Sequence, residues 1–113
     1  MIIYWHNPRC SKSRAGLSLL KAHGAEVQTR AYLDDPPSIA ELKEMVAALN
    51  ISAVDMMRTG ETLFKELGLT KDSAEPDLLS AMSAHPILIE RPIAIAGGKA
   101  VIGRPTEALK TLL

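Results

Sequence analysis

The first thirty residues predict a strand that passes directly into a helix and then a second strand. The apolar run Ile2–Trp5 is rich in strand-forming residues and stops at Asn7-Pro8, a turn signal. Apolar residues then recur at helical spacing from Ser11 to His23, ahead of Gly24, which suits a left-handed helix cap. The predicted inward face of this helix carries Ala15, Leu19 and Ala22, with Leu20 beside them. A strand at 27–33 completes two strands joined by a crossover helix, which is the unit of an α/β sheet.

The middle of the chain is predicted to be helical. Ser38 precedes Glu41 by three residues, which is the spacing of a capping box, and a helix is expected from there to Asn50. The apolar residues that share one face of this helix are Leu42, Met45, Val46 and Leu49. Shorter helical stretches are predicted at 52–58, 63–67 and 77–84, because glycine and proline separate them.

The C-terminal part predicts a hairpin and a last helix. Strands at 93–95 and 100–102 flank the tight turn Gly97-Gly98. A helix over 106–112 follows, with its apolar residues turned inward: Leu109, Leu112 and Leu113. The order of elements predicts an α/β fold, a thioredoxin-like mixed sheet with an inserted helical subdomain at roughly 38–84, within a single domain over 1–113.

Charge and hydropathy limit the classes of protein to which this chain can belong. Thirteen basic and thirteen acidic residues cancel, so no nucleic-acid partner and no anionic membrane surface is implied. The sequence has no apolar run of the length that spans a membrane, and Met1 to Pro8 does not resemble a signal peptide. We therefore expect a cytoplasmic protein that works as a monomer.

Cys10 is the only cysteine and the strongest candidate for chemistry. It lies between the Asn7-Pro8 turn and the first helix, where free backbone N–H groups favour a thiolate. Nearby cations, Arg9, Lys12 and Arg14, and nearby hydroxyls, Ser11 and Ser13, are expected to support that thiolate. The alternative is that Cys10 is a small core residue.

Three arginines are candidates for binding an oxyanion beside Cys10: Arg58, Arg91 and Arg104. The last two precede prolines, which favours extended backbone for both, although each arginine could instead be a solvated surface charge. His6 either helps to orient Cys10 or caps the turn. No metal site is predicted, since one cysteine and three scattered histidines show no ligand spacing.

Several blocks of the sequence together resemble the glutaredoxin-coupled arsenate reductase (ArsC) family. They are IIYWHNPRCSKSR, YLDDPP, MRTG, FKELGL, HPILIERPI and GRPTEALKTLL. The resemblance runs nearly end to end, and NPRCSKSR and GKAVIGRP are more similar to the family's chromosomal branch than to its arsenic-resistance members.

The resemblance implies an enzyme that reduces arsenate to arsenite. In this interpretation Cys10 is the nucleophile, Arg58, Arg91 and Arg104 bind the oxyanion, and His6 and Ser13 support the thiolate. Glutathione is the co-substrate, glutaredoxin is the protein partner, no cofactor is bound, and the Arg91-Pro92 peptide bond is cis.

Two other functions stay open at this stage. One is a thiol oxidoreductase acting on glutathionylated substrates, since Cys10 and Ser13 form a CxxS motif. The other is a Spx-like transcriptional regulator that binds RNA polymerase, although Ser13 stands where such regulators carry the second cysteine of their redox switch.

Overall fold

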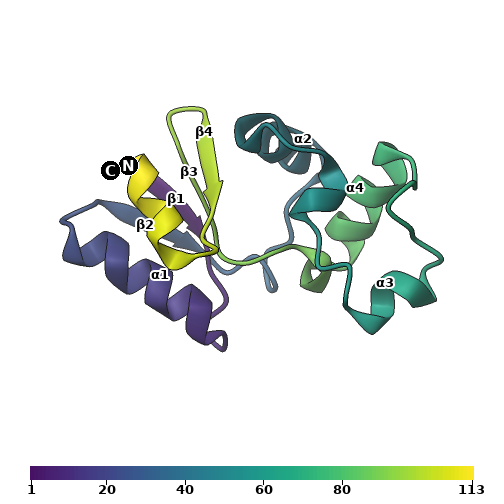
Figure 1. The fold of residues 1–113 in the computed structure, drawn as a ribbon, viewed down its shortest axis with the longest axis horizontal. Helices are drawn as coiled ribbons and strands as arrows, with labels where there is room; N and C mark the ends of the chain where they lie inside the picture. The colour runs from purple at the N-terminus through teal and green to yellow at the C-terminus, as the bar shows by residue number, and fades with distance from the viewer. The chain divides into compact units, whose positions relative to one another are not determined.

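The computed structural model describes residues 1–113 and contains a four-stranded mixed sheet built from both ends of the chain (Figure 1). The strands are β1 (Ile2–Trp5), β2 (Val27–Arg30), β3 (Ile93–Ala96) and β4 (Lys99–Ile102), in the order β2-β1-β3-β4. β1 runs parallel to β2 and antiparallel to β3, with Tyr4 opposite both Thr29 and Ala94. The predicted crossover and the predicted C-terminal hairpin are therefore both confirmed.

The chain divides into two compact units. The sheet unit comprises Met1–Asp35 and Arg91–Leu113, and the helical unit comprises Pro36–Glu90. The helical unit contains the whole of the predicted helical insertion, and the sheet unit needs both ends of the chain. That residues 1–113 behave as a single domain stays a prediction.

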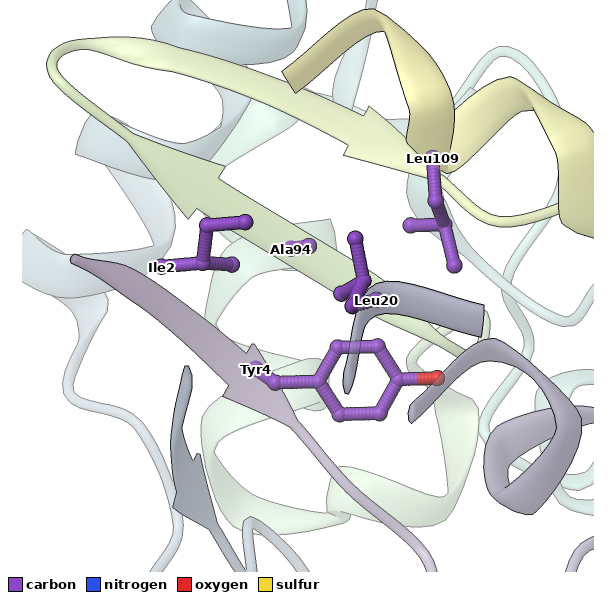
Figure 2. Packing of buried hydrophobic residues seen from close by; sticks show 5 residues of the cluster. All are labelled: Ile2, Tyr4, Leu20, Ala94 and Leu109. Atoms are coloured by element: carbon purple, nitrogen blue, oxygen red, sulfur yellow. The ribbon is translucent and has the colours of Figure 1, made fainter. Parts of the chain in front are cut away.

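One face of the sheet is covered by the helix α1 (Ser11–Ala22) and by the 3-10 helix η3 (Thr106–Leu112), which contact each other. Alternate side chains of a strand point to the same face, so Ile2 and Tyr4 of β1 point together into this layer. Figure 2 shows the buried cluster that results: Ile2, Tyr4, Leu20, Ala94 and Leu109. This cluster is the core that packs α1 and η3 against the sheet.

The inward face of α1 differs from the predicted one. The buried residues of the helix are Ser13, Gly16 and Leu20, whereas Ala15 and Ala22 are exposed. The small Gly16 faces inward because the hydroxyl of Tyr4 occupies the space that a larger side chain would fill. Apolar periodicity could not show this, since two of the three residues that face the core, Ser13 and Gly16, are small or polar.

The hairpin turn agrees with its local sequence signal, and the last helix agrees with its signal only in part. Gly97 and Gly98 have φ values of 56° and 81°, and positive φ at both central residues is what a type I′ turn requires. The 106–112 helix forms as a 3-10 helix, with Leu109 buried but Leu113 52% exposed, so the inward placement of Leu113 was wrong. The peptide bonds Arg91-Pro92 and Arg104-Pro105 are both cis.

The helical unit begins with the predicted capping box. The Glu41 N–H donates to Ser38 Oγ over 3.1 Å and the Ser38 N–H donates to Glu41 Oε1 over 3.0 Å. The helices of the unit are α2 (Ile39–Leu49), η1 (Ala53–Met56), α3 (Thr62–Glu66), α4 (Glu75–Ala84) and η2 (Pro86–Leu88). None of the helices in either unit combines the length and the apolar character needed to cross a membrane.

Candidate active site

Cys10 is the N-cap residue of α1, at the junction that the sequence predicts. Its backbone is extended, with φ −97° and ψ 122°, and its N–H donates to the Asn7 carbonyl over 3.0 Å. The Arg14 N–H donates to the Cys10 carbonyl over 3.0 Å, which is the first hydrogen bond of the helix. The side chain is partly exposed, so the structure contradicts the alternative of a buried core cysteine. The sulfur therefore lies at the end of a helix where unpaired N–H groups gather.

Opposing effects act on the pKa of the Cys10 thiol. Burial raises the pKa, but the Ser13 N–H, the Arg91 guanidinium and the Lys12 N–H all favour the thiolate, and the net result is a pKa below that of an ordinary cysteine. The Nε and Nη1 atoms of Arg91 are shielded from solvent, which strengthens their interaction with a neighbouring charge. Cys10 is thus set up as a nucleophile.

The cation whose charge lowers the Cys10 pKa is Arg91, from the far end of the chain. The neighbours that the sequence suggested are arranged differently. Arg9, Lys12 and Arg14 are exposed, and Arg14 Nη1 donates to the Pro8 carbonyl over 2.8 Å. Of these three, Lys12 contributes to the pKa through its backbone N–H.

Ser13 links the first turn of α1 to the end of β1. Its Oγ lies 2.7 Å from His6 Nδ1 and accepts a hydrogen bond from the Asn7 N–H over 2.9 Å. Burial lowers the pKa of His6, and the charges of Arg14 and Lys21 lower it further, so the ring is neutral at neutral pH. The hydroxyl of Ser13 is bonded to His6 and Asn7, and the group of Ser13 that favours the thiolate is its N–H. His6 is thus connected to the first turn of α1 by its contact with Ser13.

Tyr4 belongs to the site although its sequence position indicates only a buried strand residue. Its hydroxyl donates to the Ser13 carbonyl over 2.7 Å, and its side chain is 0% exposed. Burial raises the pKa of Tyr4 to about 12, and the nearby Cys10 charge raises it as well. The available sequence signal is Gly16, a glycine inside a helix, which leaves room for the Tyr4 hydroxyl.

The three candidate arginines are divided between the two units. Arg91 and Arg104 share the sheet unit with Cys10, and Arg104 Nε donates to the Arg91 carbonyl over 2.8 Å. Arg58 lies in the helical unit, where its N–H donates to the Leu88 carbonyl over 2.7 Å and its Nη1 is 2.7 Å from Glu61 Oε1. The structure therefore brings Arg91 and Arg104 together within one unit, and the roles of all three arginines stay predictions.

The sheet unit thus brings a thiol with a lowered pKa and several hydrogen-bond donors together. A thiolate, two backbone N–H groups and a partly buried guanidinium meet at the start of α1. Guanidinium and backbone N–H groups are the donors that bind oxyanions, and a thiolate attacks electrophilic atoms. This arrangement suits chemistry in which a sulfur attacks the central atom of a bound oxyanion.

Comparison with known proteins agrees with the resemblance in the sequence. Residues 5–112 match the ArsC family. The chain belongs to the ArsC family. It is 50% identical over 111 residues to a protein of Neisseria meningitidis named arsenate reductase, covering 96% of this chain and 95% of that protein. It is also 49% identical over 105 residues to the uncharacterized protein YfgD of Escherichia coli K12, covering 91% of this chain and 88% of that protein.

A solved structure described as an arsenate reductase from Vibrio cholerae shares the fold. Its TM-score against this chain is 0.94 at 43% sequence identity, with 99% of this chain and 97% of that chain covered. The predicted α/β fold, a thioredoxin-like mixed sheet accompanied by helices, is confirmed.

Proposed function

We propose that this protein reduces arsenate to arsenite, with the Cys10 thiolate as nucleophile. The observation that carries the proposal is the Cys10 sulfur at the start of α1, where the Arg91 guanidinium and the Ser13 N–H lower its pKa. Relatives at 50% identity that are named arsenate reductases support the same substrate. An oxyanion and a thiolate repel each other, and the Arg91 charge and the N–H groups offset that repulsion.

The proposed reaction begins when the Cys10 thiolate attacks the arsenic of arsenate. A sulfur–arsenic bond forms, and one arsenic oxygen is protonated and leaves. The thiol of glutathione then displaces a second arsenic oxygen, which leaves as water, and a glutaredoxin thiolate attacks the glutathione sulfur. The bond between that sulfur and arsenic breaks, its electron pair reduces As(V) to As(III), and a glutaredoxin–glutathione mixed disulfide forms. Water then replaces the Cys10 sulfur on arsenic, and arsenite leaves. Over the whole reaction two thiols are oxidised to one disulfide, two electrons reduce As(V) to As(III), and one water is released.

Each remaining site residue has a proposed role. Arg58, Arg91 and Arg104 bind the arsenate oxygens, since guanidinium groups match oxyanions with paired N–H donors. Ser13 and His6 hold the first turn of α1 against the end of β1, so that the Ser13 N–H keeps its position at the sulfur. The proposal requires glutathione and glutaredoxin as reaction partners but no bound cofactor, in a monomeric, cytoplasmic enzyme.

A coupled assay tests the proposal. Purified protein is mixed with arsenate, glutathione, glutaredoxin, glutathione reductase and NADPH, and NADPH oxidation is followed. Wild type is expected to turn over, Cys10→Ser to be inactive, and Arg91→Gln to lose roughly 10²- to 10³-fold in kcat/KM, the usual cost of removing one oxyanion donor. Arsenate-dependent turnover that Cys10→Ser retains, or none in freshly prepared wild type, contradicts the proposal.

A second candidate is a thiol oxidoreductase acting on glutathionylated substrates. The observation that favours it is the activated Cys10 thiolate, which needs no oxyanion to attack a mixed disulfide. Deglutathionylation that is lost in Cys10→Ser but kept in Arg58→Ala and Arg104→Ala supports this candidate. Loss of activity in all three variants favours arsenate.

A further inference from the structure

A cavity lies in the sheet unit directly before the nucleophile. It has a volume of about 230 Å³, and the loop after β1 and the turn after β2 form its walls. The loop contributes His6, Asn7, Pro8 and Arg9, and the turn contributes Ala31, Leu33 and Asp34. Cys10 follows this loop directly in the sequence and is the N-cap residue of α1. The residues of the loop that line the cavity therefore lead into the start of that helix.

In each wall of the cavity a backbone N–H donates a hydrogen bond that closes a turn. The Arg9 N–H donates to Asn7 Oδ1 over 3.1 Å, which closes the loop in front of Cys10. The Asp34 N–H donates to the Ala31 carbonyl over 3.0 Å, which closes the turn that carries Leu33. The cavity is therefore built from two ordered turns, one of which leads into the nucleophile.

The cavity presents opposite charges on its two walls. Arg9 comes from one wall and Asp34 from the other, and both side chains are exposed to solvent. Pro8 and Leu33 add apolar groups to the lining of the cavity. A complementary ligand has a carboxylate for Arg9, an ammonium group for Asp34 and a mostly uncharged middle.

Glutathione supplies both groups, with a carboxylate at its glycine end and, at its γ-glutamyl end, an ammonium group beside a second carboxylate. An extended tripeptide spans about 10 Å, and the Cα of Pro8 is at most about 7.6 Å from that of Cys10. Pro8, which lines the cavity, is therefore closer to Cys10 than the length of an extended glutathione.

We propose that the cavity lined by Asn7, Pro8, Arg9, Leu33 and Asp34 binds the glutathione that reacts at Cys10, with Arg9 on its glycine carboxylate and Asp34 on its ammonium group. This assignment rests on the proposed function, because it places the co-substrate of that reaction. It adds a binding site and a ligand orientation that the nucleophile and the three arginines do not provide.

A disulfide-exchange experiment tests the cavity without arsenate. The Cys10 thiolate attacks one sulfur of glutathione disulfide, a Cys10–glutathione disulfide forms, and a glutathione thiolate leaves. The rate is compared with that of 2-hydroxyethyl disulfide, which lacks both charges, so that the ratio cancels the reactivity of the thiolate itself. Arg9→Gln and Asp34→Asn are each expected to lower this ratio about two- to five-fold, the effect of an exposed ion pair.

Matched controls remove the same charges elsewhere in the sheet unit. Lys110→Gln and Glu107→Gln alter exposed residues of η3 and are expected to leave the ratio unchanged. A ratio that is the same in wild type, Arg9→Gln and Asp34→Asn overturns the glutathione site.

The coupled assay separates this proposal from the proposed function. Arg9→Gln and Asp34→Asn are expected to raise the KM for glutathione while the KM for arsenate stays the same. If they raise the KM for glutaredoxin instead, the cavity is a protein-docking surface and the glutathione site is refuted. If wild type shows no arsenate turnover, the proposed function fails, and the disulfide ratio still decides whether the cavity binds glutathione.

Discussion

The guanidinium of Arg91 and the thiol of Cys10 form the charge pair on which the proposed chemistry depends. We expect Arg91→Gln to raise the pKa of Cys10, because it removes both a hydrogen bond to the thiolate and a positive charge beside it. The measurement is the rate of iodoacetamide alkylation as a function of pH. Wild type is expected to alkylate with an apparent pKa below that of a free thiol.

Arg9→Gln is the control for this experiment. Arg9 is next to Cys10 in the sequence, but its side chain is exposed and the charge that lowers the Cys10 pKa is that of Arg91. We expect the alkylation profile of Arg9→Gln to match that of wild type. An equal rise in both variants would mean that the general positive charge of the loop, and not Arg91, stabilises the thiolate.

Tyr4→Phe tests a residue that acts on the sulfur through Ser13. The lost hydroxyl leaves the Ser13 carbonyl without its 2.7 Å donor, and Ser13 carries the N–H that favours the thiolate. We expect a loss of about 1 kcal/mol in the free energy of unfolding, together with a raised alkylation pKa of Cys10.

Measuring the Cys10 pKa shows whether Tyr4 positions Ser13 at the sulfur or only stabilises the fold. Ser38→Ala removes the cap of α2 in the helical unit and should also lower the unfolding free energy by about 1 kcal/mol. Its alkylation profile should be that of wild type. A Tyr4→Phe profile that coincides with that of Ser38→Ala shows that Tyr4 is structural only.

The sequence predicts the position of Cys10 but not all of the residues that surround its sulfur. A cysteine between a turn signal and a helix indicates an N-cap by local rules alone, and Cys10 is that residue. The link from Arg91 to Cys10 depends on β3 pairing with β1, and the link from Tyr4 to Ser13 depends on how α1 packs. No local pattern carries such tertiary information.

The inner face of α1 includes two small residues, Ser13 and Gly16, and Gly16 is its tightest point. A Cβ at this position would collide with the Tyr4 hydroxyl and lie 2.8 Å from Leu109 Cδ1. We therefore expect Gly16→Ala to lower the unfolding free energy by about 1–3 kcal/mol, although alanine is the better helix former by about 1 kcal/mol. Chemical denaturation measures the change.

Gly60 provides the matched control for Gly16. A Cβ at Gly60 has no heavy atom within 4 Å. Gly60→Ala is therefore expected to be neutral or slightly stabilising, since it restricts the unfolded chain without a collision. If Gly16→Ala behaves in the same way, α1 can shift without cost and the close approach to Tyr4 is not a constraint.

Elements with strong local signals follow their predictions closely. The Ser38–Glu41 capping box and the Gly97-Gly98 turn satisfy backbone groups or φ requirements within a few residues, so the sequence alone determines them. The inner face of α1 and the 3-10 form of η3 could not be predicted in that way. The inner face of α1 depends on the space that Tyr4 leaves at Gly16.

The stability of the whole molecule is expected to depend on the protonation of His6. Folding lowers the pKa of His6, chiefly by burial, so the unfolded chain binds the proton more tightly. This contribution is fully present above the unfolded value of about 6.5 and is lost as the pH falls from there toward the folded value.

The variant His6→Asn removes this titration while it keeps a polar group near Ser13. We expect wild type to lose more unfolding free energy than His6→Asn between about pH 7.5 and about pH 5.5. His23→Asn, at the exposed end of α1, serves as the control. An identical pH dependence in wild type and His6→Asn would show that His6 titrates alike in the folded and unfolded states.

Whether the two units unfold together tests the single-domain prediction. Trp5 is the only tryptophan and lies in the sheet unit, while most of the α-helical residues lie in the helical unit. We expect tryptophan fluorescence and far-UV circular dichroism to give the same denaturant midpoint, as in a two-state transition. Two separate midpoints would mean that the units are independent domains.

The division of the sheet unit between the two ends of the chain has a consequence for the protein while it is being made. Cys10 is synthesised before Arg91 and before the strands β3 and β4. A nascent chain can therefore carry the cysteine without the guanidinium that lowers its pKa. Its sulfur stays a mostly protonated, slowly reacting thiol, and the reactivity that invites oxidation arises only in the finished fold.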